Sequence, residues 1–172
     1  MTTAAGLGGY PESVPETPST QLLELSGGWH GGAVPHEASC PLGADEESAK
    51  TARDFSRTTL RRWGIPGLSA DVGLVVSELV TNALRHGVRS KHGHPVPPIQ
   101  LRLMRRVPNL VLCAVADPST AAPVRRDPEY AAETGRGLQV IESCCHQWGW
   151  SLLERGGKIV WAAFTVGGGS HL

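Results

Sequence analysis

The strongest constraint on the fold is a helix that the sequence predicts over residues 69–87. Ser69 is a suitable N-cap, Asp71 lies in the first turn where the helix dipole favours an acid, and Gly87 is a suitable end. The apolar side chains of this segment recur at helical spacing and form a wide face: Val72, Val75, Val76, Leu79, Val80 and Ala83. A face this wide indicates a helix that is largely buried in a folded domain.

The segments around this helix predict an α+β fold. Strands occur in pairs joined by tight turns, which favours a two-layer sandwich with a mixed, mostly antiparallel sheet and helices on one face. Residues 117–134 are polar and contain several prolines, and they predict a long loop. The order lacks the strict strand–helix alternation of a dinucleotide fold. The other predicted elements are strands at 36–42, 99–103, 110–116, 148–153 and 159–166, and helices at 46–63 and 135–145.

Composition divides the chain into three parts. Residues 1–33 are rich in Gly, Pro, Ser and Thr, which predicts a disordered leader. The folded domain is expected over residues 34–166, with a short tail at 167–172. The chain has 16 basic and 16 acidic side chains, but no Lys or Arg precedes Lys50. The balanced total argues against a general nucleic-acid coat, while the basic body leaves room for a local anion site.

The sequence favours a cytoplasmic protein. Residues 1–20 lack the charged and apolar regions of a secretory signal, and no stretch approaches the roughly 20 apolar residues of a membrane span. The cysteines form no CxxC pair, so we expect each to be a reduced, small core hydrophobe: Cys40, Cys113, Cys144 and Cys145.

Polar side chains interrupt the predicted helix along one stripe. Glu78 and Asn82 are four residues apart, so they lie on the same face, and His86 continues the stripe one turn later. A carboxylate and an amide on a largely buried helix need partners, because burying them unpaired is costly. The alternative is an ordinary solvent-facing stripe on an amphipathic helix.

Two further motifs follow along the chain. Asp117 comes directly after a predicted buried strand, where its alternative role is turn formation with Pro118. At Gly135, Arg136 and Gly137, two glycines flank an arginine where a loop enters a helix. Backbone amides there can face an anion, and the helix N-terminus adds its dipole. An ordinary helix start is the alternative, since no third glycine completes a dinucleotide-binding fingerprint.

Taken in order, these motifs resemble those of a known superfamily. The run Glu78–Gly87 resembles the N box of the GHKL, or histidine kinase-like, ATP-binding superfamily, which includes gyrase-type ATPases and histidine kinases. Asp117 resembles the acid of its first glycine box, and Gly135–Leu138 resembles its second. The resemblance implies a Bergerat-type ATP-binding fold.

Within this superfamily, the chain is most similar to the anti-sigma factor serine/threonine kinases and especially to their actinobacterial relatives. The likeness extends beyond the ATP motifs to Thr59–Gly64 and Gly157–Trp161, and it covers about residues 34–166. It therefore spans the whole predicted domain.

The resemblance implies a role for each motif residue. Asn82 would offer its amide oxygen to Mg²⁺, and Glu78 would act as general base toward the attacking hydroxyl. Asp117 would accept a hydrogen bond from the adenine amino group. Gly135 and Gly137 would let the backbone approach the phosphates of ATP.

Other implied roles remain open. Arg136 could bind phosphate as a cation or remain a solvated surface residue, and His86 could close the helix or touch the nucleotide. Leu138 completes the second glycine box and is expected among the nucleotide-binding residues. Residues 118–134 would form a mobile lid over bound ATP.

The implied function is phosphate transfer from Mg-ATP to a Ser or Thr of an anti-sigma antagonist, which would control transcription. The expected partners are that antagonist and a sigma factor, with no direct nucleic acid and no membrane; relatives often dimerise, which leaves a homodimer open.

Two departures from the family pattern favour a catalytically silent nucleotide- or protein-binding module as the alternative. They are Pro118–Thr120 after the acid and Ile159 in place of a common threonine. A stand-alone ATPase is a third alternative.

Overall fold

The computed structural model describes residues 36–87, 98–106, 109–123, 137–154 and 156–167. All of them belong to one compact unit, Ala33–Leu172. The leader predicted at 1–33 lies outside the described residues, as does the predicted tail beyond Gly167.

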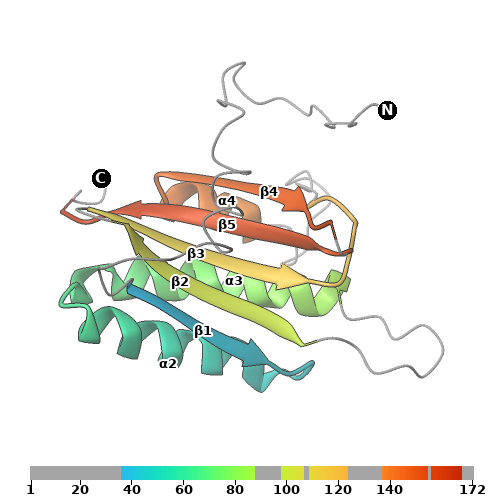
Figure 1. Ribbon diagram of the computed structural model, residues 1–172, viewed down its shortest axis with the longest axis horizontal. Helices are drawn as coiled ribbons and strands as arrows, with labels where there is room; N and C mark the ends of the chain where they lie inside the picture. Colours follow the sequence, from blue (N-terminus) through green and yellow to red (C-terminus); the bar gives the residue numbers. More distant parts are fainter. Residues whose placement is uncertain (1–35, 88–97, 107–108, 124–136, 155, 168–172) are drawn as a thin grey trace, which may run out of the picture. The chain divides into compact units, whose positions relative to one another are not determined.

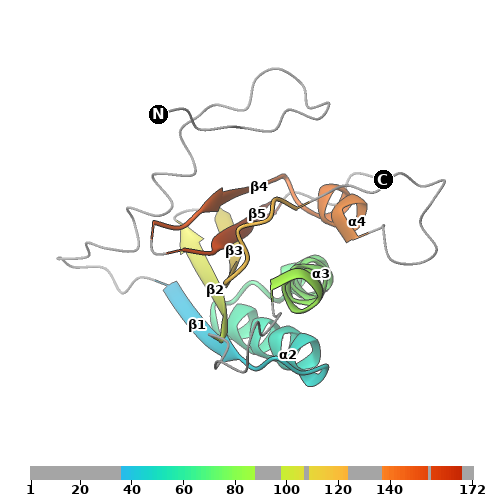
Figure 2. The ribbon, with the colours of Figure 1, turned by 90° about the vertical axis from the view of Figure 1, so that its right-hand side faces the viewer.

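Within the described residues, five strands form one sheet in the order β1-β2-β3-β5-β4. Helices α2, α3 and α4 cover one face of this sheet (Figures 1 and 2). The predicted α+β sandwich with helices on one face is confirmed, and every neighbouring strand pair is antiparallel. The strands are β1 (His36–Leu42), β2 (Ile99–Arg106), β3 (Leu110–Asp117), β4 (Gln147–Leu152) and β5 (Lys158–Thr165); the helices are α2 (Glu47–Arg62), the short 3₁₀ helix η1 (Pro66–Leu68), α3 (Ser69–Gly87) and α4 (Gly137–Cys144).

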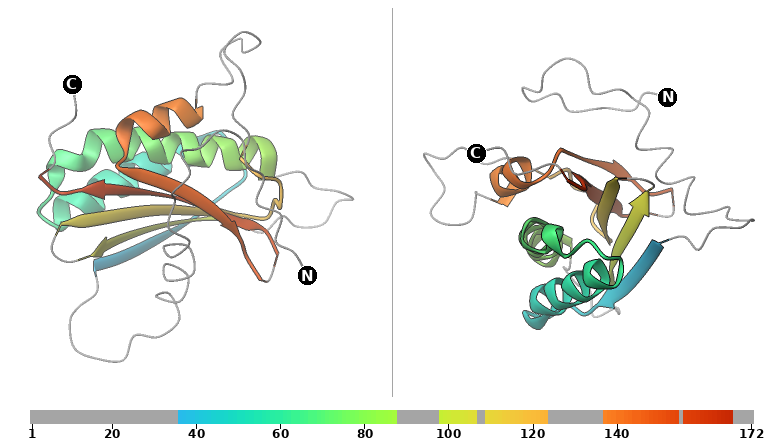
Figure 3. Two further views of the ribbon diagram at one scale, coloured as in Figure 1. Left: turned by 90° about the horizontal axis from the view of Figure 1, so that it is seen from above. Right: turned by 90° about the vertical axis from the view of Figure 1, so that its left-hand side faces the viewer.

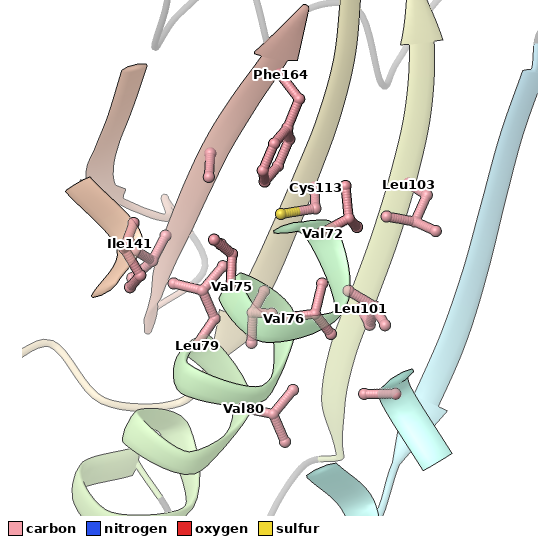
Figure 4. Close-up of a cluster of buried hydrophobic side chains, with 14 of the residues drawn as sticks. Val72, Val75, Val76, Leu79, Val80, Leu101, Leu103, Cys113, Ile141 and Phe164 are labelled. Carbon is pink, nitrogen blue, oxygen red and sulfur yellow. The ribbon is translucent and has the colours of Figure 1, made fainter. Parts of the chain in front are cut away.

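Helix α3 occupies the centre of the helical layer, between α2 and α4 (Figures 2 and 3). Its predicted apolar face is buried: Val72, Val75, Val76 and Val80 have no exposed surface. Each such side chain contributes about 1.5–3 kcal/mol when it leaves water. The side chains gathered around this face include Leu101, Leu103, Cys113, Ile141 and Phe164 (Figure 4).

Length and composition alone would allow α3 to cross a membrane. An 18-residue window within Pro66–Arg85 has a mean hydropathy of 1.2, so the expectation that no stretch approaches a span is wrong by this criterion of length and composition. In the structure, 44% of this window is buried inside the domain. Packing against the sheet and the neighbouring helices accounts for the hydropathy of a core helix.

The cysteines are all free. Cys113 lies in the core on β3, and its burial is the main reason that the pKa of its thiol rises to about 12. Burial likewise raises the pKa of Cys145 to about 11. These two thiols stay protonated at neutral pH, and Cys113 fills space as the small core hydrophobe that was expected.

The register of the sheet decides which strand residues face the helices. In β5, Val160, Ala162 and Phe164 belong to the buried core, and alternate residues of a strand share one face. Lys158 therefore lies on the same face as these apolar side chains, and it is only 4% exposed. Its cross-strand neighbour is Asp117 of β3. The register thus places two charged side chains together at the edge of the core.

Alanine at Gly157 should destabilise the domain more than alanine at Gly156. Both glycines lie in the β4–β5 turn with positive φ, 86° at Gly157 and 90° at Gly156, which costs an L-residue about 1–2 kcal/mol. Only at Gly157 would the added Cβ also collide with the backbone carbonyl oxygen of Asp117. Urea denaturation should rank wild type above Gly156→Ala, and Gly156→Ala above Gly157→Ala. Equal free energies of unfolding for the two variants would contradict the close packing of this turn against β3.

Candidate functional site

The site forms where the first residue of α4 meets the polar stripe of α3. Glu78 and Asn82 are half-buried and lie one helical turn apart. A Cβ placed on Gly137 would lie 2.7 Å from Oε2 of Glu78, and 3.5 and 3.6 Å from Nδ2 and Oδ1 of Asn82. Three residues predicted from two separate motifs therefore meet at one point. A side chain at position 137 would fill the space that these polar atoms face.

The N-terminus of α4 shapes the electrostatics of this site. The first backbone N–H groups of a helix lack partners within the helix, and its dipole favours negative charge nearby. Among the described residues, no side chain forms an ion pair or hydrogen bond with Glu78. The Glu78 carboxylate therefore lies at the start of α4 without a side-chain partner among the described residues.

A buried ion pair lies at the adjoining ends of β3 and β5. Nζ of Lys158 donates to Oδ1 of Asp117 over 3.0 Å, with the two side chains 6% and 2% exposed. The backbone N–H of Ser119 donates to the same Oδ1 over 2.8 Å. A carboxylate can accept about four hydrogen bonds, so these two leave acceptor capacity for an adenine amino group. The adenine-binding role of Asp117 stays a prediction.

Lys158 is the residue of this region that motif reasoning missed. Its sequence neighbours, Gly156 and Gly157, suggest only a hairpin turn. The alternation of β5 carries the signal, because it places Lys158 in phase with Val160 and therefore in the core. A lysine in that position requires an acidic partner, since an unpaired buried charge is strongly unfavourable.

The other predicted site residues divide into two groups. Leu138 is 6% exposed and belongs to the apolar core, so its side chain anchors α4 to the domain. Gly135, Arg136 and the side chain of His86 lie outside the described part of the chain, and their predicted roles remain predictions. The predicted lid is described only as far as Pro123.

The described residues contain no group of three or more His, Cys, Asp or Glu side chains that could hold a metal ion. Mg²⁺ does not require such a cage, because it usually keeps several waters and binds one or two protein oxygens together with phosphate oxygens. Asn82 has its amide beside the space at Gly137, with the Glu78 carboxylate one turn away. This donor set fits a Mg²⁺ ion that arrives with a nucleotide.

Comparison with known proteins agrees with this geometry. The family model of the histidine kinase-like ATPase domain matches residues 42–164. This range includes α3 and α4, which form the site, and all the motif residues of the site. The chain belongs to this family. Membership of this family implies that the domain binds ATP.

A solved structure shares the fold of this ATPase domain. The crystal structure of the RsbU and RsbW domains of Rv1364c from Mycobacterium tuberculosis is similar with a TM-score of 0.55 and 20% sequence identity. The match covers 74% of this chain and 31% of that chain, so this protein spans about a third of that chain's length. No significant match occurs among curated protein sequences.

Removing the ammonium of Lys158 should strongly destabilise the ATPase domain. Lys158→Met leaves the Asp117 carboxylate buried without its ion partner, and we expect the free energy of unfolding to fall by about 3–5 kcal/mol. The double variant Asp117→Asn/Lys158→Met should be more stable than Lys158→Met alone, because no uncompensated charge remains. Urea denaturation measures both. A loss below about 1 kcal/mol for Lys158→Met would instead place the pair among weak surface ion pairs.

Gly137→Ala should weaken ATP binding while the domain stays folded. The added methyl group would fill the space at the start of α4 that the phosphates of ATP are expected to approach, and it would crowd Glu78 and the Asn82 amide, at a cost of about 1–3 kcal/mol. Calorimetric titration with Mg-ATP should report this loss of affinity, and circular dichroism should report an unchanged fold. Gly67→Ala is the control, because nothing lies within 4 Å of a Cβ at that position. If the two variants bound ATP with equal affinity, the prediction that Gly137 lies beside the bound nucleotide would be wrong.

Proposed function

We propose that this protein is a cytoplasmic, ATP-binding regulator that transfers phosphate from Mg-ATP to a Ser or Thr of an anti-sigma antagonist. The observation that carries the proposal is the close approach of Gly137 to Glu78 and Asn82. Family membership supports ATP as the phosphate donor. The sequence resemblance to anti-sigma kinases motivates the class of partner, and the fold shared with a chain that contains an RsbW domain is in keeping with it.

In this mechanism, Glu78 acts as the general base. It accepts the proton of the Ser or Thr hydroxyl while the hydroxyl oxygen forms a bond to the γ-phosphorus, and the bond from that phosphorus to the oxygen of ADP breaks. Phosphoryl transfer asks the protein mainly for positioning and charge stabilisation. Asn82 would hold Mg²⁺ through its amide oxygen, and the ion would offset charge on the phosphates. Gly137 keeps the entry to Glu78 clear.

A catalytically silent binding module is the second candidate function. It is favoured by the engagement of Asp117, whose Oδ1 already accepts from Lys158 and Ser119. Pro118 follows this acid directly, and Ile159 stands where the family commonly has a threonine hydroxyl. These features would weaken adenine binding, and turnover with it, without altering the fold.

Glu78→Gln should separate the two candidates. The amide cannot accept the hydroxyl proton, so we expect phosphate transfer to an antagonist to fall about 10²- to 10⁴-fold. Binding of Mg-ATP should change little, because Glu78 acts on the acceptor hydroxyl rather than on the nucleotide. Transfer of the γ-phosphate from radiolabelled ATP to candidate antagonist proteins measures the first quantity, and calorimetry measures the second.

Glu47→Gln is the control for this substitution, since Glu47 is an exposed acid at the start of α2. It should transfer phosphate like the wild type. Equal transfer by Glu78→Gln and wild type would exclude Glu78 as the base. ATP binding without transfer to any candidate antagonist would favour the silent module.

A further inference from the structure

A groove of about 490 Å³ lies between α2 and α3. Arg53 and Arg57 of α2 line it on one side, and Leu74, Ser77 and Glu78 of α3 line it on the other. Leu74 is 47% exposed, whereas the large apolar side chains on the opposite face of α3 are buried. Nη1 of Arg53 donates to Oγ of Ser77 over 3.1 Å and so crosses the groove. The groove therefore combines cationic walls with an exposed apolar side chain.

Glu78 belongs to both the groove and the nucleotide site. Its Oε2 would lie 2.7 Å from a Cβ on Gly137, and the same residue lines the groove. A molecule in the groove thus approaches the proposed base from the α2 side, while the space beside Gly137 opens toward α4. The nucleotide and the phosphate acceptor can reach Glu78 from different directions.

The α2 wall of the groove is part of a basic stripe. Lys50, Arg53, Arg57 and Arg61 recur every three or four residues, so they share one face of α2, and all four are exposed. Helix α2 contains five bases against two acids. Asp54 lies 3.5 Å from Arg57, but both side chains are more than half exposed, so this pair neutralises the stripe only weakly. The stripe favours an acidic ligand.

We propose that this groove docks an acidic segment of the phosphate-acceptor protein and delivers its Ser or Thr hydroxyl to Glu78. Carboxylates of the segment would contact Arg53 and Arg57, and an apolar residue beside the hydroxyl would cover Leu74. A nucleic acid fits less well, because a phosphate backbone offers no apolar group to cover Leu74. This inference rests on the proposed function, since it assigns the second substrate of the same site.

The experiment uses two fluorescein-labelled peptides as probes. One has the sequence Glu-Glu-Leu-Ser-Glu-Glu, and the other has Lys in place of every Glu. Fluorescence anisotropy on the full chain should show saturable binding of the acidic peptide only, weakening as salt is added. Arg57→Glu should weaken binding of the acidic peptide about tenfold or more, because it replaces an attraction with a repulsion. Leu74→Asp should weaken it as well.

Arg62→Glu is the control with the same charge change on the same helix. Arg62 is exposed and lies five residues beyond Arg57, so it points about 140° away from it. We expect less than a roughly twofold change in peptide affinity for this variant. Equal weakening by Arg57→Glu and Arg62→Glu would overturn the proposal, as would the absence of saturable binding to wild type. Equally tight binding of the basic peptide or of duplex DNA would overturn it too.

Titration of the same variants with Mg-ATP distinguishes this inference from the proposed function. Arg57→Glu should bind Mg-ATP like the wild type, because Arg57 lies on the groove and not beside Gly137. Loss of peptide binding with intact ATP binding supports the groove as a separate subsite. Peptide binding without any ATP binding would support the groove as a docking site and contradict the proposed kinase activity.

Discussion

The whole domain depends on the burial of α3. The sheet covers one side of this helix, and α2 and α4 flank it, so its apolar face is enclosed by other apolar side chains. Only the remaining part of its surface can carry polar groups without a large desolvation cost. Glu78 and Asn82 occupy that part, and the packing that stabilises the fold also fixes the direction in which they point. Stability and site geometry therefore have the same source.

Much of this arrangement could be predicted from the sequence because the signals are local. The apolar spacing of 69–87 predicted α3, and paired strands with tight turns predicted an antiparallel sheet with helices on one face. The grouping of Glu78, Asn82 and Gly137 followed from recognisable motifs. In each case a short stretch of chain contains enough information to indicate the element or the role.

The rest depended on contacts between distant segments. Lys158 and Asp117 are 41 positions apart, and they meet only because β3 and β5 pair in one register. The bases of α2 look like an ordinary solvated face until α3 is placed beside them. At Pro66–Arg85 the local signal was misleading instead of missing. Its hydropathy alone would allow a membrane span, whereas the tertiary structure shows that the helix packs in the core.

The ion pair of Asp117 and Lys158 has a consequence for how the sequence can vary over evolutionary time. Neither side chain can be replaced alone without stranding the other charge away from water. The two positions are expected to change together or not at all among relatives, although they lie in different motifs. A covarying acid and lysine at the ends of two adjacent strands would then mark members of the family that anchor the acid at the end of this strand in the same way.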